Sequence, residues 1–192
     1  MQAYVVMILE NKISPRKRIY AGITGGLVGG ITMEIPMVIL AIVMGMPVDS
    51  FQSLLGMLFG SKPESASLVG MGIHLFVGMA IGAIFGIIAD SSKKLRINGF
   101  KRGIGLGIIP GMIAMIIIGL PVLFVFIPPV MMKMILMMNP QITEQIAMQQ
   151  LQGIQMLMII GTFVGHIIYG ITLGATFTAI VRKGVKAEER IR

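Results

Sequence analysis

The sequence predicts an all-α integral membrane protein with four transmembrane helices, arranged as two parallel helical hairpins with both termini inside the cell. Three observations lead to this fold class. Of the 192 residues, 55% are hydrophobic and 12% are charged, which is about half the charged fraction of an ordinary soluble domain. Four apolar stretches are each long enough to cross a bilayer as a helix. Motifs of the first half of the chain also recur in the second half.

The four predicted spans contain almost no charged or histidine side chains. Glu34 is the one such residue in the first span, His74 in the second and His166 in the fourth, while the third span has none. The low charge is typical of segments that cross the hydrocarbon core. The predicted spans cover about 19–44, 67–89, 103–127 and 154–181.

Positive charge marks the predicted cytoplasmic side. Of the 16 Lys and Arg residues, all but Lys62 and Lys133 lie before the first span, between the second and third spans, or after the fourth. The positive-inside rule then places both termini in the cytoplasm of a multi-pass protein of the cell membrane. The net charge of +8 is explained in this way without nucleic acid, and no loop is long enough for a nucleic-acid-binding module.

An internal duplication organises the chain. The pattern H-x3-G-x3-G-A-x-F begins at His74 and again at His166, and an offset of 85 residues pairs Pro36 of the first span with Pro121 of the third. Because each copy starts inside, the repeats are parallel, with a pseudo-two-fold axis along the membrane normal. The predicted units are a cytoplasmic or interfacial segment 1–15, a first repeat 16–92, a second repeat 101–182 with an outer Met-rich loop 128–153, and a basic tail 183–192.

Small residues recur four positions apart along the spans. Such residues share a helix face and let helix backbones approach closely, so they predict a tight bundle. Pro36 and Pro121 remove backbone donors late in the first and third spans and are expected to kink them. The predicted packing glycines are Gly22, Gly26, Gly30, Gly78, Gly82, Gly107, Gly111, Gly170 and Gly174.

Glu34, His74 and His166 lie at one predicted depth. Each is 16 residues from a charged cytoplasmic edge, which is ~24 Å along a helix. A bare carboxylate there costs about 2.5–3.5 kcal/mol even on lenient scales. The three residues therefore predict either a proton relay or divalent-metal site, or a hydrogen-bonded clamp between the repeats. The clamp is the preferred interpretation, because a duplicated fold needs the same contact twice. Glu34 has Gly119 as its counterpart, and this asymmetry is the best hint of a functional role.

The outer connections carry the remaining features. Pro128-Pro129 is expected to end the third span, and 141–152 to form a short amphipathic helix along the outer surface. The first outer connection has an apolar stretch, 51–59, that is expected to be re-entrant or interfacial. A methionine cluster in the second connection can bind Cu(I) through thioethers, fill apolar gaps or dock against a partner. The cluster consists of Met131, Met132, Met134, Met137 and Met138.

Sequence motifs of enzymes are missing. The chain has no Cys, no nucleophile elbow, no Walker motif, no zinc-protease motif and no dinucleotide fingerprint after a strand. We therefore expect a protein that is not an enzyme and has no cofactor, with a divalent metal or copper as the alternative.

The repeated H-x3-G-x3-G motif, the proline in the preceding span and the parallel hairpins resemble small four-span prokaryotic membrane proteins of unknown function, over about 16–182. The Met-rich, Cys-free composition is similar to that of archaeal proteins. The resemblance implies no activity.

Two functions are predicted. The first is a structural or accessory subunit whose glycine-rich and Met-rich faces pack against a larger membrane complex, such as an ammonia or methane monooxygenase. The alternative is a small proton or metal-ion transporter or channel that uses Glu34, His74 and His166. The expected partners are the lipid bilayer and other membrane subunits or further copies of the chain.

Overall fold

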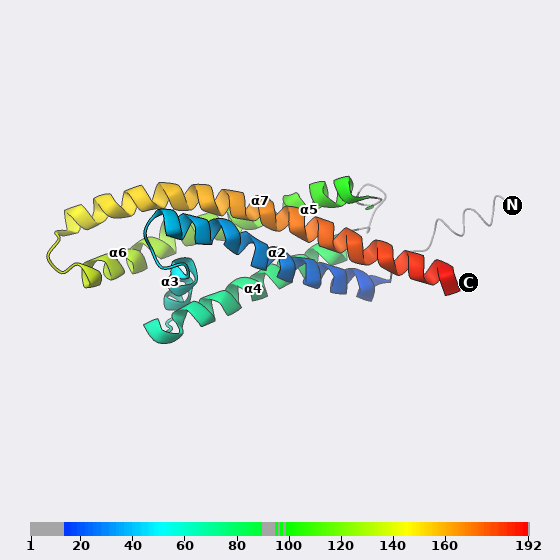
Figure 1. Cartoon of the computed structure of the whole chain (residues 1–192), viewed down its shortest axis with the longest axis horizontal. Helices are drawn as coiled ribbons and strands as arrows, with labels where there is room; N and C mark the ends of the chain where they lie inside the picture. The colour runs from blue at the N-terminus through cyan, green and yellow to red at the C-terminus, as the bar shows by residue number, and fades with distance from the viewer. Residues whose placement is uncertain (1–13, 90–94, 96, 98, 192) are drawn as a thin grey trace.

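The fold is a bundle of long helices, seen in a computed structural model that describes residues 14–89, 95, 97 and 99–191. Within those residues the secondary structure is helical and contains no strand. Four helices are long and apolar enough to cross a membrane, and they run along the long axis of the molecule (Figure 1). The four predicted helices are therefore confirmed. Residues 1–13 of the predicted N-terminal segment lie outside the described residues.

The first half of the bundle has clear start and stop signals. The Ser14 side chain accepts a hydrogen bond from the Lys17 backbone at the start of the first helix, as an N-cap should. The third helix begins with Pro63, a residue that suits the first turn. Gly45 and Gly60, just past the first two helices, have φ values of 66° and 81°, which glycine adopts without strain. The three helices are α2 (Pro15–Val43), α3 (Ser50–Leu58) and α4 (Pro63–Ile88).

The second half contains two longer helical stretches. The first is uninterrupted from Phe100 to Met138, and the second is the 48-residue helix α7 (Glu144–Ile191). The last turns of α7 therefore include 183–191, where the sequence predicted a basic tail. The first stretch is made of α5 (Phe100–Ala114), two π-helical segments, η2 (Met115–Gly119) and η3 (Val122–Phe126), and α6 (Ile127–Met138).

The predicted outer loop at 128–153 was wrong. Pro128-Pro129 does not end the third helical stretch, because both prolines lie in the first turn of α6, which follows η3 without a break. The segment 141–152 is not a separate helix, since α7 begins at Glu144 and continues through it. Only 139–143 connects the two long helical stretches.

The prolines sit in helices in different ways. Pro36 lies inside α2, which remains α-helical through it. Pro121 lies between η2 and η3, where the Leu120 and Ile127 amides donate to carbonyls five residues earlier. The π register lets the backbone absorb the missing proline donor within a continuous helix.

The helices pack in the order α4, α2, α7, α5, with α3 against the first half of α4 (Figure 1). Glycine backbones make the close contacts. A Cβ added at Gly22 would collide with the Gly82 carbonyl, and one added at Gly107 would collide with the Gly170 carbonyl. The glycine rows are therefore covered within the chain, where small residues allow close helix approach.

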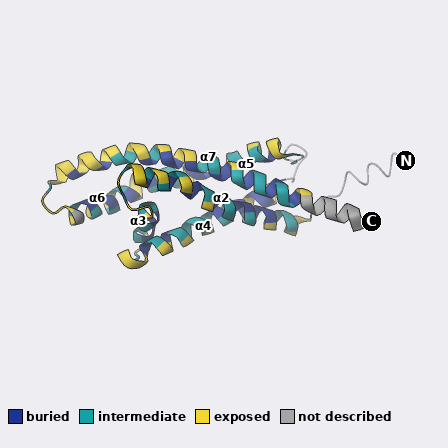
Figure 2. Ribbon diagram, viewed as in Figure 1, coloured by how far each residue is buried: buried dark blue, intermediate teal, exposed yellow. Residues whose placement is uncertain are grey.

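Two apolar cores lie at different levels of the bundle. One includes Ala21, Phe85, Leu173 and Phe177. The other is formed where α3, η3, α6 and the first half of α7 meet, with Leu54, Ile127, Met131 and Leu151 among its members. Exposed positions cover the outward faces of the helices, and buried positions line the inside (Figure 2).

The outward faces are apolar. On α2, four isoleucines at helical spacing are each more than half exposed: Ile31, Ile35, Ile39 and Ile42. An apolar face that points away from the core is what a helix needs when lipid surrounds it. The exposed surface is therefore compatible with a multi-pass membrane protein.

Candidate functional site

A polar cluster is buried inside the bundle, contributed by three different helices. Glu34 comes from α2, Gln52 from α3 and His74 from α4. Glu34 is 8% exposed and Gln52 3% exposed. Such burial of polar groups is costly unless they have partners, so their arrangement needs a physical account.

The Glu34 carboxylate lies between the other two side chains. Its Oε2 accepts a hydrogen bond from Gln52 Nε2. Its Oε1 lies 3.2 Å from His74 Nε2, yet neither atom makes an aligned hydrogen bond. A hydrogen bond also links His74 to the backbone of Gly30, one turn before Glu34. Gln52 thus holds Glu34 and the Gly30 backbone holds His74, so that Glu34 Oε1 and His74 Nε2 face each other.

The local fold explains how Gln52 reaches Glu34. The turn after α2 contains Gly45 in a left-handed conformation, and it sends α3 back against α4. There the helices touch through backbone, because a Cβ at Gly70 would collide with the Gln52 carbonyl and one at Gly56 with the Ala66 carbonyl. This close approach fixes α3 beside the end of α2, with Gln52 pointing inward.

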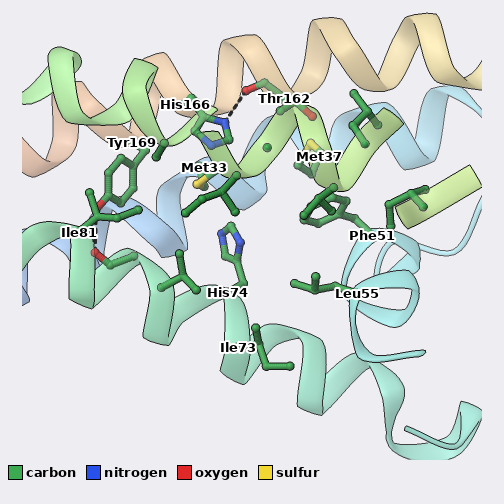
Figure 3. A pocket seen from close by; sticks show the side chains of 18 of the residues that line it. Met33, Met37, Phe51, Leu55, Ile73, His74, Ile81, Thr162, His166 and Tyr169 are labelled. Atoms are coloured by element: carbon green, nitrogen blue, oxygen red, sulfur yellow. Dashed lines mark hydrogen bonds between the residues drawn. The ribbon is translucent and has the colours of Figure 1, made fainter. Parts of the chain in front are cut away.

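His166 lies on the opposite wall of a cavity from His74 (Figure 3). The cavity has a volume of about 160 Å³ and is lined mainly by apolar side chains, with both histidines and Tyr169 among them. His166 Nδ1 lies 2.8 Å from the Thr162 carbonyl. If Nδ1 carries the proton, that contact leaves Nε2 free as an acceptor.

The surroundings of the two histidines differ at one position. Gly119 of η2, which corresponds to Glu34, lies against His166, and a Cβ added there would be 3.3 Å from His166 Cε1. His166 therefore has a glycine where His74 has a carboxylate. The asymmetry predicted from the sequence is reproduced in the contacts of the two rings.

Tyr169 joins the two halves of the bundle. Its hydroxyl donates a 2.7 Å hydrogen bond from α7 to the Gly78 carbonyl of α4, and its ring packs on Gly29 of α2. A second bond of 3.1 Å runs from Thr32 of α2 to Thr172 of α7. Interhelical contacts of this kind are a common packing device in membrane bundles.

Of the three polar residues singled out from the sequence, two are in contact and the third is separate. Glu34 and His74 are in contact, whereas His166 faces them across the cavity. Sequence reasoning missed Gln52 and Tyr169. Gln52 is the only amide in the apolar stretch 51–59, and that isolation was the available signal.

Possible metal ligands are distributed as follows. Within the described part of the chain, no three His, Cys, Asp or Glu side chains gather closely enough to hold a metal ion. In the methionine cluster of α6, Met131 is buried in the second core while Met137 is largely exposed. The side chain of Met138 lies outside the described residues.

Comparisons with protein families, with curated proteins and with solved structures found nothing that matches this chain.

Proposed function

We propose that the chain is a multi-pass protein of the cell membrane, built from two parallel hairpin repeats with both termini in the cytoplasm. Four apolar helices support the membrane location, and the distribution of Lys and Arg supports the orientation. Equivalent contacts support the duplication. Gly22 meets Gly82 in the first half, and Gly107, its partner at an offset of 85 residues, meets Gly170 and Gly174 in the second.

Within this architecture, we propose a small transporter or channel that moves protons or metal cations through the Glu34–His74 pair. The contact of 3.2 Å between the Glu34 carboxylate and the partly buried His74 ring carries the proposal. Ionisable residues inside a membrane bundle are rare because they are costly, and they mark ion or proton pathways. His74 lines the adjoining cavity, with His166 on its far wall, so we propose that water or an ion reaches the pair from the His74 side.

A clamp that only holds helices together explains the cluster less well. Structural polar groups in buried positions are normally satisfied by hydrogen bonds. Here three buried atoms lack an aligned hydrogen bond: Glu34 Oε1, Gln52 Oε1 and His74 Nε2. Tyr169 and Thr32 already link the two halves through satisfied bonds. The Glu34 cluster is therefore better explained as a site that takes up a proton or cation.

The accessory-subunit hypothesis remains as a second proposal, with one observation in its favour. Helices α4 and α5 make little contact, and an apolar groove of about 490 Å³ lies between them. A further membrane helix could pack there. The glycine rows, however, are covered inside the chain and are not free for a partner. Purification from native membranes tests this proposal, and recovery only as a lone homo-oligomer would contradict it.

The transport proposal is tested by reconstitution into liposomes. We expect the wild-type protein to carry protons or divalent metal ions above the level of empty liposomes, and Glu34→Gln to abolish that flux. Glu64→Gln is the matched control, because Glu64 lies exposed in the first turn of α4. Flux that is absent from the wild type, or that survives in Glu34→Gln, would contradict the proposal.

A further inference from the structure

Among the described residues, four buried side-chain atoms lack a hydrogen-bond partner, and all but Arg18 Nε belong to the Glu34 cluster. Glu34 Oε1, Gln52 Oε1 and His74 Nε2 belong to side chains that already touch through other contacts. All three atoms carry lone pairs when the imidazole is neutral and its other nitrogen holds the proton. Buried lone pairs that no donor satisfies are costly, and a cation bound by these three side chains would stabilise them.

The geometry fits a metal ion between the carboxylate and the imidazole. Glu34 Oε1 and His74 Nε2 are 3.2 Å apart. Metal–oxygen and metal–nitrogen bonds of ~2.1 Å across this gap would subtend about 100° at the ion. That angle lies between the tetrahedral and octahedral values, so the separation of the two atoms suits ligands of one ion.

We propose that Glu34, Gln52 and His74 bind one divalent first-row transition cation, such as Mn²⁺, Co²⁺ or Zn²⁺. A carboxylate oxygen, an amide oxygen and an imidazole nitrogen are a borderline-hard ligand set that suits these ions. The hydrogen bond from Gln52 Nε2 to Glu34 Oε2 orients both groups, as outer contacts of metal ligands commonly do. The inference rests on the proposed transport function, since it names the cargo of that site.

The ligand set differs from the one predicted from the sequence. Gln52 takes the place given there to His166, which lies across the cavity and is bonded to the Thr162 carbonyl. Because Gly119 replaces the carboxylate beside His166, the second half of the bundle lacks an equivalent set. The structure therefore predicts one cation per chain.

The cavity supplies the remaining coordination positions. Three protein ligands leave an ion free to keep one or more water molecules, as in sites where metals exchange ligands. His74 lines the 160 Å³ cavity, so water bound to the ion would lie on that side. An incompletely enclosed ion can also be released, as transport requires.

Histidine NMR tests the proposal, because the chain has only two His and no Cys. Tag-free protein with ¹⁵N-labelled histidine is titrated with Zn²⁺ in nanodiscs. We expect one equivalent of Zn²⁺ to shift the ring nitrogens of His74, assigned with His166→Gln, and to leave those of His166 in place. Gln52→Leu should weaken Zn²⁺ binding by about tenfold or more. Gln52→Glu, which keeps an oxygen donor, should restore it.

The matched control is Gln152→Leu, which removes an amide from an exposed position of α7 and should leave Zn²⁺ affinity unchanged. The inference is overturned if Zn²⁺ shifts neither ring, if it shifts only His166, or if Gln52→Leu binds as tightly as the wild type. Proton flux that depends on Glu34 would then leave the proposed function standing. Zn²⁺ binding at His74 without any flux would instead support the cation site and contradict the transport function.

Discussion

Phe85 of α4 and Phe177 of α7 pack edge to face, with ring centroids 5.1 Å apart and planes at 74°. These two residues occupy the same position of the repeated motif, 92 residues apart. Equivalent residues meet directly only near the axis that relates two repeats. His74 and His166, equivalent by the same offset, likewise face each other across the cavity (Figure 3). Both relationships support a pseudo-two-fold axis between α4 and α7.

A double-mutant cycle at this aromatic pair should reveal coupling. Phe85→Leu and Phe177→Leu each remove one ring of an edge-to-face contact, so their effects on the free energy of unfolding should differ from additivity by about 0.5–1.5 kcal/mol. Unfolding in mixed micelles measures these energies. The control pairs Phe177→Leu with Phe76→Leu, because Phe76 lies exposed on α4; this pair should be additive. Additivity at Phe85 and Phe177 would contradict the assigned contact.

A glycine comparison within α4 tests the close helix contacts. Gly82→Ala should destabilise the bundle by about 1–3 kcal/mol, because the new Cβ would collide with the Gly22 carbonyl and lie 2.9 Å from the Gly26 Cα. Gly72→Ala on the same helix meets nothing within 4 Å. That control should be neutral or stabilise the helix by up to about 1 kcal/mol. Equal thermal stabilities of the two variants would show that α2 and α4 do not approach as described.

The orientation can be tested with single cysteines, because the chain has none of its own. Ser14→Cys and Ser65→Cys replace exposed serines at opposite ends of the first hairpin. With both termini in the cytoplasm, a membrane-impermeant maleimide should label Cys at 65 in intact cells and Cys at 14 only after the membrane is opened. The reverse pattern would place the termini outside.

Much of the fold could be predicted from the sequence, because apolar length and glycine spacing act locally along each helix. The four helices follow from such local signals, whereas the sequence placed Glu34, His74 and His166 at one depth without showing which of them are in contact. The helix through Pro128-Pro129 was not predicted, because proline removes a backbone donor and usually ends a helix, whereas here η3 continues directly into α6. Gln52 could not be placed either, because its position depends on how α3 folds back onto α4.

The second half also departs from exact repetition in ways that only packing reveals. Tyr169 corresponds to Val77 of the first repeat, so its hydrogen bond to Gly78 has no counterpart. Helix α2 packs closely on α7, whereas the corresponding pair α5 and α4 leaves an apolar groove. A duplicated motif predicts which helices are related, while individual side chains determine which helix pairs pack closely.

The central claim is that Glu34 and His74 act as one unit in moving a cation, and a double-mutant cycle on flux tests it most directly. Flux through liposomes is measured for the wild type, Glu34→Gln, His74→Gln and the double variant, with Glu64→Gln as the control. When residues act as a unit, the effects of substituting them are strongly non-additive. We therefore predict that each single substitution reduces flux as far as the double variant does. Independent, additive losses, or a single substitution with wild-type flux, would contradict the claim.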